Sequence, residues 1–240
     1  MCIDVLGVDF DSLTAQDAVS RACEMISSRK KGYVVTPNPE IVWMARRNEK
    51  LKSAIRGAAL TLPDGIGIIL AARILGRPLR EKIAGIEFIE ALFAEMAKTE
   101  RSVYLFGAKP GVAERAGQNL AAAYPGLCIA GATDGYFTDN EAIVDKINSA
   151  RPDVLLVCLG APKQELWMAE NLARIDVALC AGLGGSLDVF AGEVRRAPAF
   201  FRKLELEWLY RLIKQPSRIK RMIKLPLFVF AAIWARIRGR

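Results

Sequence analysis

Short apolar segments alternate with longer segments of helical periodicity along most of the chain, and each apolar segment ends at Gly, Pro or Asn. This alternation is typical of βαβ units, in which each strand is followed by a helix that returns the chain to the same sheet. We therefore predict an α/β fold with a mostly parallel sheet. The predicted strands lie near Ile3–Val8, Tyr33–Thr36, Ser102–Phe106, Leu127–Ala130, Val154–Leu159 and Val177–Ala181.

The last three of these strands are apolar throughout, which favours burial on both faces of the sheet. No internal repeat or low-complexity linker interrupts the pattern. We expect one domain over residues 1–197 and a helical appendage over residues 198–240.

The appendage carries most of the positive charge. From Arg202 to Arg240 there are eleven Lys or Arg and two Glu, a net charge of +9, whereas the whole chain has +8. The preceding residues are thus nearly neutral. A basic segment on a neutral body suggests an anionic partner, either phospholipid or nucleic acid.

The appendage also has helical periodicity. Leu204–Lys214 is amphipathic, Pro216 interrupts the pattern, and Ile219–Lys224 resumes it. The eleven apolar residues Leu225–Ala235 are fewer than the roughly 20 that a membrane span needs. We interpret this segment as an interfacial helix, because its Leu, Ile, Phe and Trp suit lipid better than nucleic acid. The alternative is a helix packed on the core.

Composition excludes several kinds of site. The chain has no histidine, which excludes a Ser-His-Asp triad, a Cys-His pair and every His-ligated metal site. The five cysteines are scattered and form no C-x-x-C, so neither a disulfide framework nor a structural zinc site is expected. No secretory signal pattern opens the sequence, and we expect a cytoplasmic protein.

Polar and glycine-rich motifs follow the predicted strands, where ligands bind in open parallel sheets. Thr36 and Asn38 lie in a loop pinned by two prolines, and Asp64 lies between Pro and Gly. Each is also an ordinary turn residue. In a chain without histidine, Asp64 is a natural candidate for the general base that accepts a proton from a sugar hydroxyl.

Three further strand-end motifs are Ser102–Gly111, Gly160–Glu165 and Gly182–Asp188. Their glycines allow close approach of the backbone to a phosphate, although such turns also occur without a ligand. In the second motif Lys163 could face a phosphate, and Gln164 offers a donor and an acceptor to a sugar.

Asp9 and Asp11 form a D-x-D, a pattern with which many glycosyltransferases hold a divalent ion. A capping-box pattern, Thr14-x-x-Asp17, follows directly. We therefore interpret the two acids as solvent-facing residues at a helix start and expect no metal site.

Taken in order, TPNPE, LPDGIGI, IAGIEF, LFGAKPG, DGYF, GAPKQE, GLGGSLDVFAG, RRAP and LEWLYRLIKQPSRIKR cover nearly the whole chain. This ordered set resembles the bacterial WecG/TagA/CpsF glycosyltransferases, typified by N-acetylmannosaminuronic acid, teichoic-acid linkage and capsule-sugar transferases. The resemblance implies a Rossmann-like, doubly wound, mostly parallel sheet. It also implies an inverting, metal-independent enzyme without a cofactor, whose acceptor is a sugar on undecaprenyl diphosphate.

The resemblance further implies roles for individual residues. Asp64 corresponds to the proposed base. Lys82 corresponds to a position that is usually arginine and that contacts a phosphate or acceptor group; lysine keeps the charge but loses the bidentate fork of arginine. The other matching residues are the sugar-contacting Thr36, Asn38 and Gln164, the uridine and diphosphate residues Tyr136, Gly184, Gly185 and Asp188, and the appendage arginines Arg211, Arg218 and Arg221.

We therefore predict transfer of N-acetylmannosamine or a relative from a UDP-sugar to a lipid-linked sugar, in cell-surface polysaccharide or teichoic-acid-type synthesis. The enzyme should act at the inner face of the cell membrane, with an anionic membrane surface and no nucleic acid as partner, and a homo-oligomer is possible. Two alternatives remain. An NAD-dependent oxidoreductase is disfavoured because no G-x-G-x-x-G follows the first strand. The second alternative is a non-enzymatic protein that binds nucleic acid through its basic tail.

Overall fold

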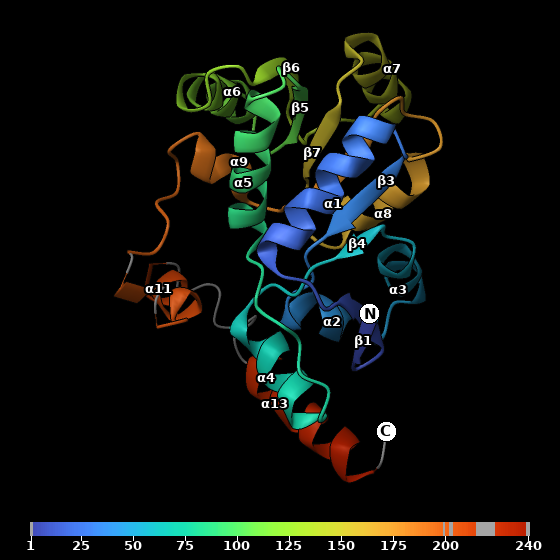
Figure 1. Ribbon diagram of the computed structural model, residues 1–240, viewed down its shortest axis with the longest axis vertical. Coiled ribbons are helices and arrows are strands. Elements are labelled where there is room, and N and C mark those ends of the chain that lie inside the picture. The colour runs from blue at the N-terminus through green and yellow to red at the C-terminus, as the bar shows by residue number, and fades with distance from the viewer. Residues whose placement is uncertain (1, 199, 202–203, 215–223, 239–240) are drawn as a thin grey trace.

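The computed structural model describes residues 2–198, 200–201, 204–214 and 224–238 (Figure 1). Its centre is a parallel sheet of six strands in the order β4-β3-β8-β7-β5-β6, which confirms the predicted fold class. In chain order these strands are β3 (Gly32–Val35), β4 (Leu60–Thr61), β5 (Ser102–Gly107), β6 (Cys128–Thr133), β7 (Val154–Cys158) and β8 (Leu179–Gly182).

Three details of the strands differ from the prediction. The single strand expected over Ile3–Val8 is wrong: β1 (Cys2–Val5) and β2 (Val8–Asp11) form an antiparallel hairpin. Its turn residues, Leu6 and Gly7, have φ values of 56° and 91°. β6 lies at the sheet edge and is partly exposed rather than buried on both faces. The two-residue β4 was not predicted.

Helices cover both faces of the sheet, so successive side chains along each inner strand point alternately into two hydrophobic cores. Along β3, Tyr33 and Val35 face one core and Val34 faces the other. The Val34 side is covered by α1 (Ala15–Ser28), α5 (Gly85–Ala97), α6 (Val112–Ala123) and α9 (Ser186–Phe190). The Tyr33 side is covered by α2 (Pro39–Ala45), α3 (Glu49–Arg56), α7 (Asn140–Ala150) and α8 (Lys163–Asn171), and extended by the hairpin and α4 (Ile66–Ile74). Figure 1 shows α1 and α5 side by side over the first of these faces.

The appendage contributes α11 (Glu207–Lys214) and α13 (Lys224–Ile237), which confirms helices in the two predicted segments. The resumed pattern over residues 219–223 lies outside the described residues. α13 runs along α4 and also contacts α2 (Figure 1). Its Phe228 and Ala232 are buried in the core, as the packed alternative expected, while its other face is exposed. The division at residue 197 stays a prediction.

α13 is fixed to the core at both ends. Lys224 Nζ lies 3.6 Å from a carboxylate oxygen of Glu40 on α2. At the other end Arg236 Nη1 donates to the carbonyl oxygen of Leu75, 3.3 Å away at the end of α4. None of the helices in the described ranges is long and apolar enough to cross a membrane.

Candidate active site

The predicted site residues follow the carboxyl ends of the strands and so lie along one edge of the sheet. In sheet order this edge carries Asp64 after β4, Thr36 and Asn38 after β3, Gly184 and Gly185 after β8, Gln164 after β7, Ala108 after β5 and Tyr136 after β6. The chain leaves β5 toward β6 but leaves the neighbouring β7 toward β8, in the opposite direction. Ligands of doubly wound sheets bind at such a switch point.

The loops after β3 and β4 form one unit that holds Asp64 beside the Thr36–Asn38 loop. The Asp64 backbone N–H donates to the carbonyl oxygen of Pro37 at 3.4 Å, and the N–H of Leu62 donates to Val35 at 2.9 Å. Gly65, with φ of 90°, then turns the chain into α4. The half-buried Asp64 carboxylate is thus carried on a turn braced by its neighbour strand.

Thr36 and Asn38 already have roles within the protein. The Asn38 Oδ1 caps α2 by accepting from the N–H groups of Glu40 and Ile41, at 3.0 and 3.1 Å. A substrate contact from Asn38 would therefore use its Nδ2 donor. Thr36 is buried against the start of α5, where a Cβ on Gly85 would lie 3.0 Å from the Thr36 Oγ1.

Lys82 joins this unit to the appendage. The N–H of Ile83 donates to the carbonyl oxygen of Pro63 at 2.9 Å, which places Lys82 near the Asp64 turn. The Lys82 ammonium forms an ion pair with Glu205, just before α11. No sequence pattern pointed to Glu205, because the pair joins residues far apart in the chain. The predicted contact of Lys82 with a phosphate or acceptor stays a prediction, and the three N–H donors of the ammonium leave room for it beside this pair.

Gln164 connects two strand-end loops. Its side chain is only 3% exposed, its Oε1 accepts from the N–H of Gly184 at 2.8 Å, and its Nε2 donates to Glu165 at 2.9 Å. These contacts engage both ends of the carboxamide within the protein. The predicted sugar contact stays a prediction. The hydrogen bond to Gly184 shows that Gln164 holds the glycine turn, which we define as residues Gly182–Gly185 between β8 and α9.

Asp188 and Tyr136 approach the switch point from two sides. Asp188 lies in the first turn of α9, whose start is close to the Cys158 thiol at the end of β7. Burial above all, and the Asp188 carboxylate in addition, raise the pKa of Cys158 to about 12. The loop of Tyr136 is joined to the β5 loop by the N–H of Gly135, which donates to Ala108 at 2.9 Å. Tyr136 itself is 71% exposed and available for stacking.

Lys163 is exposed and also contacts the protein, and its predicted contact with a phosphate stays a prediction. Its Nζ donates to the carbonyl oxygen of Gly135 at 3.2 Å and lies 4.4 Å from the centre of the Phe137 ring. Lys163 therefore fixes the loop that carries Tyr136 to the start of α8. This cation–π contact could not be predicted from the motif D-G-Y-F, because it forms only where the loop after β6 approaches the loop after β7 in the folded chain.

Asp9 and Asp11 lie on β2, so their placement at a helix start was wrong. The Asp11 Oδ2 accepts from the N–H of Thr61 at 2.9 Å and thus joins the hairpin to β4. The predicted capping box is confirmed: Thr14 and Asp17 cap α1 reciprocally. Within the ranges that the structure describes, no cluster of three or more acids or thiols could hold a metal ion.

The appendage arginines cannot be placed at this edge. Arg218 and Arg221 lie outside the described residues, and the position of the Arg211 side chain on α11 is likewise not described. Their predicted contact with the diphosphate stays a prediction.

Glu165 is a buried carboxyl that the sequence did not mark as special. Burial raises its pKa, and the hydrogen bond from Gln164 opposes that effect. A raised folded-state pKa means that the native protein binds the proton more tightly than the unfolded chain does. The resulting stabilisation is complete below the unfolded value of about 4.3 and is lost as pH rises through the folded pKa.

We expect Glu165→Gln to gain thermal stability relative to the wild type as the pH rises from about 5 to about 8, because the amide never ionises. Melting temperatures of both proteins at the two pH values check this. Glu170→Gln, at an exposed position of the same helix, is the control, and its melting temperature should differ from that of the wild type by the same amount at both pH values. The same pH-independent difference in melting temperature for Glu165→Gln would contradict the raised pKa of Glu165.

The chain matches the model of the glycosyl transferase WecG/TagA/CpsF family over residues 3–240. It therefore belongs to this family and is a glycosyltransferase, in agreement with the resemblance of its motifs.

The chain is also similar, over most of its length, to curated proteins. An N-acetylglucosaminyldiphosphoundecaprenol N-acetyl-beta-D-mannosaminyltransferase of Bacillus spizizenii is 36% identical over 208 residues, covering 87% of this chain and 81% of that protein. Proteins with the same name from Bacillus subtilis and Staphylococcus aureus are 36% and 34% identical, covering 85% and 95% of this chain and 80% and 91% of their own.

Proposed function

We propose that this enzyme transfers N-acetylmannosamine from its UDP derivative to the N-acetylglucosamine of a diphosphoundecaprenol-linked acceptor, with inversion at the anomeric carbon. The names of the similar proteins supply the sugar and the acceptor. The observation that carries the proposal is the unit formed by the Asp64 turn and the Thr36–Asn38 loop at the carboxyl edge of the sheet. It joins a carboxylate to polar groups suited to a sugar.

The reaction is a single displacement. The Asp64 carboxylate accepts the proton of the acceptor hydroxyl as that oxygen forms a bond to the anomeric carbon. The bond between the anomeric carbon and the UDP oxygen breaks, and UDP leaves with the electron pair. Inversion follows because attack and departure occur on opposite sides of that carbon. The product ion UDP carries the charge that the site must stabilise.

The proposal assigns stabilisation of the diphosphate to protein groups rather than to a divalent ion. One acid of the D-x-D, Asp11, accepts a hydrogen bond from the Thr61 N–H, and its other carboxylate oxygen lies 3.7 Å from an Arg21 nitrogen. The glycine turn before α9 offers backbone N–H groups, and the appendage arginines offer cations.

The test is product formation from a panel of UDP-sugars and a prenyl-diphosphate N-acetylglucosamine acceptor, followed by mass spectrometry. We expect one N-acetylhexosamine to be added from UDP-N-acetylmannosamine, with full activity in excess EDTA. Chelation that abolishes turnover, with recovery on addition of magnesium or manganese, would refute metal independence. Turnover of another UDP-sugar alone would refute the donor assignment.

We further propose that the exposed face of α13 binds the inner surface of the membrane. This face carries Leu227, Phe230, Ile233, Trp234 and Ile237, all substantially exposed. Phe230 of this face also lines an apolar groove, together with Leu225, Pro226 and Val229 of α13 and Trp208 of α11. A shallow apolar face beside a basic segment is suited to an anionic leaflet, where each basic residue contributes about 1 kcal/mol.

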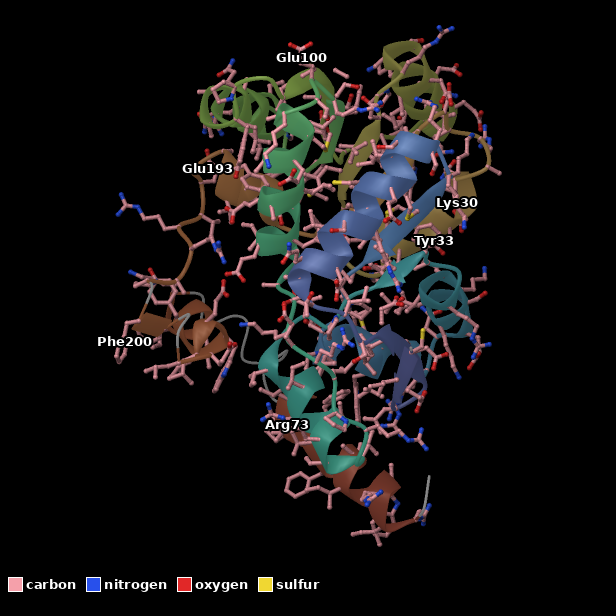
Figure 2. The ribbon with its side chains drawn as sticks, in the orientation of Figure 1. Lys30, Tyr33, Arg73, Glu100, Glu193 and Phe200 are labelled. Carbon is pink, nitrogen blue, oxygen red and sulfur yellow. The ribbon has the colours of Figure 1, made fainter. Side chains whose placement is uncertain are left out.

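We expect Phe230→Glu to weaken binding to vesicles of anionic phospholipid by about tenfold, because a charge replaces an inserted ring. Co-sedimentation at low and high salt measures this. Phe200→Glu is the matched control, since Phe200 and Phe230 are 67% and 66% exposed on different elements. Figure 2 shows Phe200 near α11, away from Arg73 on the α4–α13 pair. Equal loss in both variants would contradict a role specific to α13.

A further inference from the structure

Glu165 combines deep burial with an incomplete set of partners. Its side chain lies in the first turn of α8 and is 1% exposed. Oε1 accepts the hydrogen bond from Gln164, but Oε2 is fully buried with no hydrogen-bond partner in the parts of the chain that the structure describes. Burial of a carboxyl without a full set of partners is destabilising. Such a group is expected where function, rather than packing, requires it.

The partner of Glu165 has two chemically different ends. The Gly184 N–H needs an acceptor, which the Gln164 Oε1 supplies at 2.8 Å. If the carboxamide were rotated by half a turn, its NH₂ group would face the Gly184 N–H and its oxygen would face the Glu165 oxygen. Both contacts would then be repulsive. An acceptor at position 165 therefore determines which end of Gln164 meets the glycine turn.

The glycine turn in turn determines where α9 begins. Gly184 has φ of 50°, in the left-handed region, and lies four residues before Asp188. The turn lies directly against α8, since a Cβ on Gly182 would be 2.6 Å from the Met168 Cε and 3.4 Å from the Gln164 Nε2. Gln164 therefore holds, at Gly184, the turn that leads into α9 and Asp188.

We infer that Glu165 is a positioning residue for the donor: it orients the Gln164 carboxamide, which holds the Gly184 turn and Asp188 in place for the UDP moiety. This inference rests on the proposed function. Glu165 itself contacts neither substrate in this account. Its effect is expected in the affinity for the donor more than in the chemical step.

The experiment compares Glu165→Met, which removes the acceptor, with Glu165→Gln, which keeps an acceptor oxygen in the same volume. We expect the Met variant to raise KM for UDP-N-acetylmannosamine by about tenfold, and the Gln variant to stay within about threefold of wild type. Hydrogen–deuterium exchange at the Gly184 amide should be faster in the Met variant and unchanged in the Gln variant. This readout does not depend on activity.

Wild-type KM and Gly184 exchange in the Met variant would overturn the inference, as would equal impairment of both variants. If the Met variant does not fold, the pair Gln164→Glu with Glu165→Met decides, because a carboxylate at position 164 offers Gly184 an acceptor in either orientation and no longer needs to be oriented. Recovered folding with protected Gly184 exchange in this pair supports the inference, and continued failure to fold or fast exchange overturns it. Failure of the wild type to use the donor would instead refute the proposed function, while Gly184 exchange still tests the positioning.

Discussion

Asp64→Asn is expected to fold and to bind UDP like the wild type but to turn over about two to four orders of magnitude more slowly. An amide has nearly the size of a carboxylate but cannot accept the proton of the acceptor hydroxyl. The turn itself should persist, because it is held by backbone hydrogen bonds from Asp64 to Pro37 and from Leu62 to Val35. Turnover with the lipid-linked acceptor, UDP calorimetry and thermal melting together measure these effects.

Asp176→Asn provides the matched control. Asp176 precedes β8 and so lies at the opposite, amino edge of the sheet, where its exposed carboxylate pairs with Arg29 at 3.1 Å. This variant should keep full turnover. Near-wild-type turnover of Asp64→Asn would remove Asp64 from the mechanism, and loss of UDP binding together with activity would indicate a binding role instead.

We propose that Arg211, Arg218 or Arg221 stabilises the leaving diphosphate. Replacing the arginine that has this role is expected to lower turnover by about two to three orders of magnitude, equivalent to about 3–4 kcal/mol in the barrier. The assay uses single Arg→Ala variants and a short-chain, water-soluble acceptor, so that membrane binding is not required. An arginine that only attaches the enzyme to the membrane would become dispensable under these conditions.

Lys214→Ala is the control for charge, because Lys214 is an exposed basic residue of α11. Truncation after Ala197 should also release the protein from vesicles and leave it nearly inactive on the soluble acceptor. It is a weaker test, however, since it uncovers the surface of α4 that buries Phe228 and Ala232. Full activity of all three arginine variants would reduce the appendage to an anchor and leave the diphosphate to the glycine turns.

The alternation of apolar and helical segments was sufficient to predict the parallel sheet, because each buried strand carries its own local pattern. The prediction of strands was less accurate where a strand depends on long-range contacts that the local sequence pattern does not show. The apolar residues from Ile3 to Val8 conceal a turn at Leu6 and Gly7, and the two residues of β4 are too few to show periodicity. The exposure of β6 depends on its place at the sheet edge, which strand composition does not reveal.

The positions of Thr36, Gln164 and Asp188 could be predicted, because these residues follow predicted strands and parallel strands place their carboxyl ends at one edge. The position of Asp64 did not follow in this way, since the strand before it, β4, was not predicted.

The hydrogen-bond and ion-pair partners of the site residues could not be predicted either. The cap formed by Asn38 is local, but the Gln164–Gly184 bond and the Lys82–Glu205 pair join segments that only the folded chain brings together. The sequence therefore indicated which residues lie at the edge, whereas the structure showed which of them already act on one another.

The most direct test of the account is the anomeric configuration of the product. The enzyme, UDP-N-acetylmannosamine and a prenyl-diphosphate N-acetylglucosamine acceptor are incubated in excess EDTA, and the product is examined by NMR while released UDP is quantified. We predict a β-linked N-acetylmannosaminyl product formed in equal amount to UDP, since a single displacement on an α-linked donor inverts the anomeric carbon. An α-linked product, or UDP release without sugar transfer, would contradict it.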